Sequence, residues 1–240
     1  MRNFWSYISN DQYSIGCTGQ TVHVYDKEGS ELAKFKDLKY AYNAAFCPTK
    51  NIFIVRATEA YFAVYSLDTL SLIKKIKFSR VNAAQDDGYC FSADGRYFFD
   101  IERHGDSTNS AIAVYDTEKF ERRKLWLAED KVTEPSYIES DSTGQIFVLG
   151  FLRGTKVCIR AGFVAKLGEQ GLTELREIPE REYDYYRDYK SLELMGFTAK
   201  AKQWSGFVYR DVDITDIEKT KRPLAELWER AGERKCEENE

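Results

Sequence analysis

The chain has 240 residues, 43% of them hydrophobic and 15% aromatic, which is enough apolar material for one sizeable core. Its 35 basic and 39 acidic residues give a formal net charge of −4, so there is no global positive field to draw it to nucleic acid or to an anionic membrane. The 4 proline and 15 glycine residues argue against a disordered or collagen-like chain. We expect a single domain over residues 1–240.

The first third of the chain predicts two units of four short strands each. The first unit covers residues 4–8, 13–17, 21–25 and 31–35, and the second covers 42–46, 52–56, 61–65 and 71–78. Asn-Asp, Thr-Gly and Lys-Glu-Gly turns interrupt the apolar runs, as is typical of antiparallel strands. The lysines in the last strand of the second unit indicate an outer, solvent-facing strand.

A third unit follows at residues 89–91, 97–101, 111–115 and 123–127, with a polar excursion over 102–110 that its composition predicts to be a loop. A fourth, more diverged unit spans about 136–178, with strands at 146–149 and 157–165. The tyrosine-rich segment 183–189 and strand candidates at 192–197 and 204–209 would supply part of a fifth, incomplete unit.

The end of the chain predicts an amphipathic helix over residues 220–235. Pro223 suits a first helical turn, and Leu224, Leu227, Trp228 and Ala231 fall on one face at three- and four-residue spacing. We expect Leu227 and Trp228 to dock this helix. The acidic residues 236–240 should form a frayed tail.

The repetition identifies the architecture. Three strands end near Val-x-Val-Tyr, with tyrosines at 25, 65 and 115 that are 40 and then 50 residues apart. Periods of this length are typical of repeated supersecondary units. A second repeated feature agrees with the first: one apolar strand in each unit, ending at Ile8, Phe46, Phe91 or Ile138, is followed at once by a polar turn. After Phe91, for example, the turn is Ser92-Ala93-Asp94-Gly95.

These motifs resemble those of the WD-repeat β-propellers. The segment Phe91-Ser92-Ala93-Asp94-Gly95-Arg96 is similar to the turn that follows the inner strand of that family, and Tyr25-Asp26 and Tyr115-Asp116 stand where the family has Trp-Asp. The resemblance implies an all-β fold: a small propeller of about five four-stranded blades, the last one incomplete, with a C-terminal α-helix. The Gly-His pair of the family is absent, because the chain's only histidines are His23 and His104.

A search for chemistry yields no catalytic residue. A nucleophile would need an activating base, and His23 is best read as an ordinary strand residue. The inner strands carry no repeated Asp, Glu or His to hold a metal, and the Gly16–Thr21 loop lacks the lysine and helix of a phosphate-binding loop. We therefore expect no metal and no cofactor. The five cysteines form no Cys-x-x-Cys pair and should be reduced core thiols.

Two segments are candidate partner-binding sites. Tyrosine with arginine is the composition enriched at interface hot spots, so the first comprises Tyr183, Tyr185, Tyr186, Arg187 and Tyr189. The alternative is that these tyrosines form a blade strand or pack against the C-terminal helix. The second segment is the charged loop near Asp100, with Arg103, His104 and Asp106.

Three functions remain open on these grounds. The leading hypothesis is a non-catalytic protein-interaction or scaffold module whose partner is another protein, with neither nucleic acid nor membrane favoured. The first alternative is a ligand- or metal-binding propeller, such as a lactonase-like hydrolase, that uses the Asp100–Asp106 region. The second is a structural subunit completed by self-association through an incomplete blade. The lack of a signal-like start or a long apolar run predicts a cytoplasmic protein.

Overall fold

The computed structural model describes residues 4–58, 60–77, 88–104, 109–127, 133–153, 161–194, 201–204, 209–212 and 223–237. The chain divides into two compact units. One comprises Met1–Cys47, Asn51–Lys77 and Asp188–Lys221, and the other comprises Pro48–Lys50, Phe78–Arg187 and Arg222–Glu240.

The first unit holds two antiparallel sheets of four consecutive strands. The first sheet contains β1 (Ser6–Ser9), β2 (Tyr13–Cys17), β3 (Val22–Asp26) and β4 (Glu31–Phe35), and the second contains β5 (Ala41–Phe46), β6 (Ile52–Ala57), β7 (Tyr61–Ser66) and β8 (Ser71–Lys77). Alternate residues of these strands, such as Ile15, Cys17, Phe53 and Tyr65, meet in one core because successive side chains of a strand point to opposite faces.

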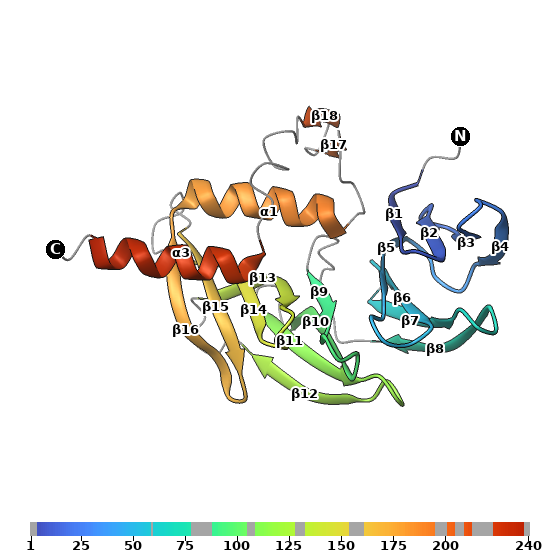
Figure 1. Ribbon diagram of the computed structural model, residues 1–240, viewed down its shortest axis with the longest axis horizontal. Helices are drawn as coiled ribbons and strands as arrows, with labels where there is room; N and C mark the ends of the chain where they lie inside the picture. The colour runs from blue at the N-terminus through green and yellow to red at the C-terminus, as the bar shows by residue number, and fades with distance from the viewer. Residues whose placement is uncertain are drawn as a thin grey trace. The chain divides into compact units, whose positions relative to one another are not determined.

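The second unit repeats this arrangement (Figure 1). Its sheets contain β9 (Tyr89–Phe91), β10 (Tyr97–His104), β11 (Asn109–Asp116) and β12 (Arg122–Leu127), then β13 (Thr133–Ser140), β14 (Ile146–Leu152), β15 (Gly162–Gly168) and β16 (Gly171–Ile178). Phe99, Ile101, Val148 and Phe163 belong to the core that these sheets share. Four successive four-stranded meanders are the arrangement of propeller blades. The prediction of a mainly β, propeller-like fold built from repeated four-stranded sheets is therefore confirmed.

The twelve strands predicted up to residue 127 all occur, and each begins within two residues of its predicted start. The loop predicted over residues 102–110 is wrong for its described residues. There β10 and β11 continue to pair, through Glu102 with Ala111 and on to His104 with Asn109. Polar composition suggested a loop, but the backbone ladder extends because partners inside the protein satisfy the buried Glu102 side chain.

The fifth unit differs most from prediction. Residues 180–194, expected to include strand segments, form the helix α1 (Glu180–Leu194). The buried tyrosines at 183, 186 and 189 recur every three residues, which is helical rather than strand spacing. Glu180 and Glu182 in the first turn favour a helix start. Beyond it, β17 (Ala201–Trp204) and β18 (Tyr209–Val212) form a two-stranded hairpin, and residues 195–200 lie outside the described part of the chain.

The C-terminal helix is confirmed as α3 (Leu224–Glu237), which contacts β14, β15 and β16. Leu224, Leu227 and Ala231 are buried. Arg176 of β16 lies 3.2 Å from the Trp228 ring centroid, and the indole Nε1 donates to the Glu174 carbonyl at 2.9 Å. The first residues of the predicted tail are thus helical, and 238–240 lie outside the described residues. Figure 1 shows α1 and α3 running across the last sheet of the second unit.

Candidate interaction site

The first predicted segment lies on α1, and its first tyrosine, Tyr183, points into the protein. Tyr183 is 2% exposed, and its Cβ lies so close to Gly162 of β15 that a methyl group there would come within 2.4 Å of it. The Tyr183 hydroxyl lies 3.1 Å from the Ser136 Oγ, and its ring packs at 5.9 Å from that of Phe151. Tyr183 therefore anchors α1 to the sheet, and its ring is not at the surface.

Tyr186 is a second inward residue. Its hydroxyl accepts a hydrogen bond from Arg230 Nη2 of α3 at 2.6 Å, and the same guanidinium lies 3.3 Å from Glu182. The alternative that these tyrosines pack against the C-terminal helix is confirmed for Tyr186, whereas the blade-strand alternative is wrong.

Tyr185, Arg187 and Tyr189 complete the predicted segment. Tyr185 and Arg187 are half-buried, and Arg187 forms an ion pair of 3.0 Å with Asp184 in the same helix. Tyr189 is buried, and its hydroxyl donates to Glu193 at 3.4 Å. Of the five predicted residues, only Tyr185 and Arg187 therefore keep part of their side chains at the surface.

The second predicted segment lies on the paired ends of β10 and β11. The backbones of Arg103 and His104 belong to β10, and Asp106 lies outside the described residues. Nearby, the fully buried Glu102 accepts a hydrogen bond from the Tyr115 hydroxyl, and Arg122 Nη1 lies 3.8 Å from its other oxygen. Burial raises the pKa of the Tyr115 phenol, so this hydroxyl remains a neutral donor.

A second buried carboxylate, that of Glu134, also accepts hydrogen bonds from side chains of the same unit. Ser110 Oγ donates to it at 2.9 Å, and Arg153 Nη2 donates at 2.6 Å. Buried charges are stable only when paired and hydrogen-bonded, and both carboxylates meet that condition with residues of their own unit. Over the described residues, no group of three or more His, Cys, Asp or Glu side chains is arranged to hold a metal ion.

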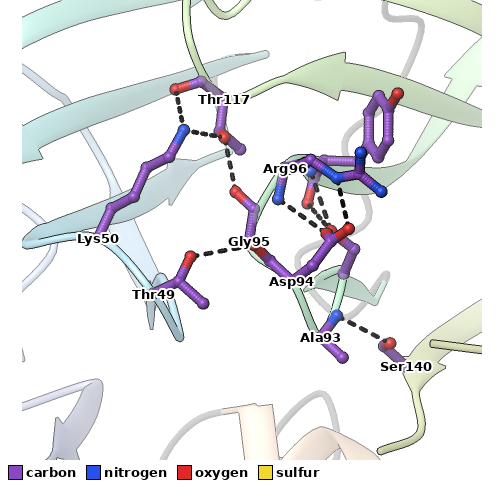
Figure 2. A network of polar contacts seen from close by, with 10 residues as sticks. Thr49, Lys50, Ala93, Asp94, Gly95, Arg96, Thr117 and Ser140 are labelled. Carbon is purple, nitrogen blue, oxygen red and sulfur yellow. Dashed lines mark hydrogen bonds and ion pairs between the residues drawn. The ribbon is translucent and has the colours of Figure 1, made fainter. Parts of the chain in front are cut away.

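The turn that carries the WD-repeat resemblance lies in a polar network (Figure 2). Asp94 accepts hydrogen bonds from Ser92 Oγ at 2.6 Å and from the Arg96 backbone and guanidinium, and these lower the pKa of its carboxyl to about 2. Lys50 donates to Thr117, whose hydroxyl donates at 2.6 Å to the Gly95 carbonyl. The network fixes the turns of the second unit. Local sequence patterns could not have predicted this network, because it joins residues as far apart in the chain as Lys50 and Thr117.

Sequence reasoning missed a set of aromatic residues where the loops of the first unit meet. We call Trp5, Tyr40, Tyr42 and Gly19 the Trp5–Tyr40 surface; Gly19 exchanges two backbone hydrogen bonds with Ala41, between the two tyrosines. Trp5 is 44% exposed and Tyr40 is 54% exposed. The Trp5 and Tyr42 rings lie 5.6 Å apart, and a Cβ at Gly19 would lie 3.5 Å from Trp5 Nε1. The only sequence signal was the Tyr-Ala-Tyr start of a strand, which does not indicate exposure.

Comparisons with known proteins support the fold and nothing finer. No protein-family model matches the chain, and no curated protein matches it either. Hydrazine synthase from Kuenenia stuttgartiensis aligns with 70% of this chain at 13% identity and a TM-score of 0.57. The WD40 β-propeller domain of Doa1 aligns with 62% at 10% identity and a TM-score of 0.46. The alignments cover 51% and 47% of those chains, so this chain spans about half their length.

Among the helices that the structure describes, none has both the length and the apolar character needed to cross a bilayer.

Proposed function

We propose that this protein is a non-catalytic interaction module that binds another protein through the Trp5–Tyr40 surface. The observation that carries the proposal is the exposure of Trp5 and Tyr40 in the first unit, where the Trp5 ring also lies 5.6 Å from that of Tyr42. Tryptophan and tyrosine are enriched among residues that dominate binding energy, because a large ring gives contact area while its polar atom stays bonded. Loops held by a rigid scaffold are common binding positions.

The buried polar residues of the second unit support this proposal over a hydrolytic one. Glu102 and Glu134 have partners from their own unit, and Asp94 is part of a turn. Each of these groups has a structural role that accounts for its position. The exposed aromatic residues of the first unit have no comparable role in the core.

The test begins with chemical crosslinking and affinity purification of the full chain from its native source, followed by binding measurements with the recovered partner. We expect Trp5→Ala combined with Tyr40→Ala to weaken binding by at least about tenfold, or ~1.4 kcal/mol. Leu32→Ala is the matched control, because Leu32 is also exposed, at 40%, but lies on the outer strand β4. We expect this control to bind as the wild type does.

Tyr185→Ala combined with Arg187→Ala tests the surface originally predicted on α1. Loss of binding in this variant alone would move the site to α1. A partner whose affinity none of these variants changes would refute the proposed surface. If native mass spectrometry finds only a second copy of the chain, the self-association alternative replaces the proposal.

A further inference from the structure

Tyr40 has a backbone conformation that tyrosine rarely adopts. Its φ is 55°, in the left-handed region that favours glycine and asparagine. Neighbouring hydrogen bonds hold it there: Thr58 N donates to the Tyr40 carbonyl at 3.2 Å, and Ala41 exchanges two hydrogen bonds with Gly19 at 3.1 and 2.9 Å. Residues kept in such conformations are often part of a function.

The other non-glycine residues with positive φ in the described part of the chain have side chains that explain their presence. Phe120 and Ala60 are buried, and Leu70 packs against the core of the first unit. The Glu174 carboxylate forms an ion pair with Lys166, with 2.9 Å between Oε2 and Nζ. Tyr40 differs because its side chain is 54% exposed. Core packing therefore does not explain why a large aromatic side chain stands at this strained position.

Three lysines lie on or against the loop that leads to this tyrosine. Lys36 and Lys39 are exposed on the same loop, and Lys75 Nζ donates to the Asp37 carbonyl of that loop at 2.6 Å. The Asp37 carboxylate, the acidic group of the loop, accepts a hydrogen bond from the core residue Tyr65 at 3.4 Å. The loop next to Tyr40 thus presents positive charge, although the chain as a whole is negative.

The strand register extends this positive charge along one end of the second sheet. Ala41 pairs with Ala57, Ala57 with Tyr61, and Tyr61 with Lys77. The ammonium groups of Lys75 and Lys77 lie 4.7 and 6.0 Å from the Tyr61 ring centroid. The half-buried Tyr61 ring therefore lies against two lysines at the same end of the sheet as Ala41, the neighbour of Tyr40.

We infer that the Trp5–Tyr40 surface binds an acidic protein segment that carries an aromatic side chain. The aromatic side chain would pack on Trp5 and Tyr40, and the carboxylates would lie against Lys36, Lys39 and Lys75. Complementary charge gives such a contact specificity and fast association. This inference rests on the proposed function and specifies the chemistry of its partner. Aromatic rings with lysines also suit single-stranded nucleic acid, but the net charge of −4 disfavours it.

The experiment uses defined polymers, so that no native partner is needed. Binding of the full chain to a random 4:1 copolymer of glutamate and tyrosine is measured at low salt, beside polyglutamate of equal length and poly(U). We expect the copolymer to bind most tightly and its affinity to fall as salt rises. Tyr40→Gly should reduce copolymer binding at least tenfold while maintaining or raising the melting temperature, because glycine removes the strain.

Two further variants sharpen the result. Lys36→Glu combined with Lys39→Glu should also reduce copolymer binding at least tenfold, whereas Leu32→Ala should leave it unchanged. The inference is overturned if the copolymer does not bind at about 100 µM, if poly(U) binds more tightly, or if Tyr40→Gly binds as well as the wild type. It is also overturned if Tyr40→Gly lowers the melting temperature, because the ring would then be serving the fold.

The polymer experiment fails separately from the proposed function. If Trp5→Ala with Tyr40→Ala abolishes binding of the native partner but the copolymer never binds, the interaction module stands and the acidic segment is wrong. If the native partner binds both this variant and the wild type equally, the proposed surface itself is wrong.

Discussion

Gly162 lies in β15 where α1 crosses the last sheet, and replacing it with alanine tests that packing directly. The added Cβ would lie 2.4 Å from the Tyr183 Cβ and 2.8 Å from the Ile178 Cγ1. Neither neighbour is the far end of a flexible side chain, so the helix itself has to move. Restoring carbon–carbon contacts of about 3.5–4.0 Å requires a shift of roughly 1–1.5 Å.

The expected cost follows from overpacking. Inserting one carbon into a tightly packed interface typically destabilises a protein by about 1–3 kcal/mol. Because α1 is held at one end by this contact, we expect Gly162→Ala to loosen α1 before it affects the strands. Backbone amides of α1 should then exchange with solvent roughly 5- to 150-fold faster, since each 1.4 kcal/mol is a factor of ten.

Hydrogen exchange followed by mass spectrometry measures this effect segment by segment. Gly168→Ala is the control, because it makes the same substitution in the same strand, where the new Cβ would come no closer than 3.2 Å, to Thr173 Cγ2. We expect the control to change stability by less than about 0.5 kcal/mol. If Gly162→Ala leaves both the stability and the exchange of α1 unchanged, the packing of Tyr183 on Gly162 is wrong.

Further predictions concern buried contacts and titration. Tyr115→Phe removes the hydroxyl that bonds the buried Glu102 and should lower the free energy of unfolding by about 1–3 kcal/mol in urea titrations. Leu227→Ala should cost about 2–5 kcal/mol and expose α3 to proteolysis, because Leu227 is only 1% exposed. The Asp94 carboxyl should titrate by NMR near pH 2, and Cys17, whose thiol pKa burial raises to about 12, should resist iodoacetamide at pH 8 until the protein unfolds.

The first three of these predictions have a comparison variant. Tyr97→Phe changes an exposed tyrosine and should not alter stability, and Glu229→Ala changes an exposed residue of α3. Ser92→Ala should raise the Asp94 pKa toward its ordinary 3.8. Because the folded pKa of Asp94 is lowered, its contribution to stability is present above about pH 3.8 and is lost as the pH falls toward 2. Equal loss of stability in variant and control, or titration of Asp94 near 3.8, would contradict the corresponding prediction.

The strand repeats were predictable because their signal is local. Alternating apolar residues and turn residues determine strands such as β2 and β6 within a few positions, and the same pattern four times over determines repeated antiparallel sheets. The C-terminal helix was predictable for the same reason, since Leu224, Leu227 and Ala231 form one face at helical spacing.

The segment around Tyr183 was not predictable from that signal. Tyrosine favours strands, and alternate tyrosines at 183 and 185 satisfy a strand pattern as well as 183 and 186 satisfy a helical one. Tertiary packing decides between the strand and the helix here. Gly162 leaves room for a helix to approach the sheet, and Arg230 of α3 donates a hydrogen bond to the Tyr186 hydroxyl. Both partners are distant in sequence from α1.

The sequence by itself therefore determined the all-β class, the repeated four-stranded units and the amphipathic last helix, because each depends on the spacing of neighbouring residues. Only the tertiary structure decided which side chains are exposed. It buried Tyr183 and Tyr186, left Trp5 and Tyr40 at the surface, and gave Glu102 its Tyr115 partner. Exposure depends on what packs against a residue from elsewhere in the chain, and no local pattern records that contact.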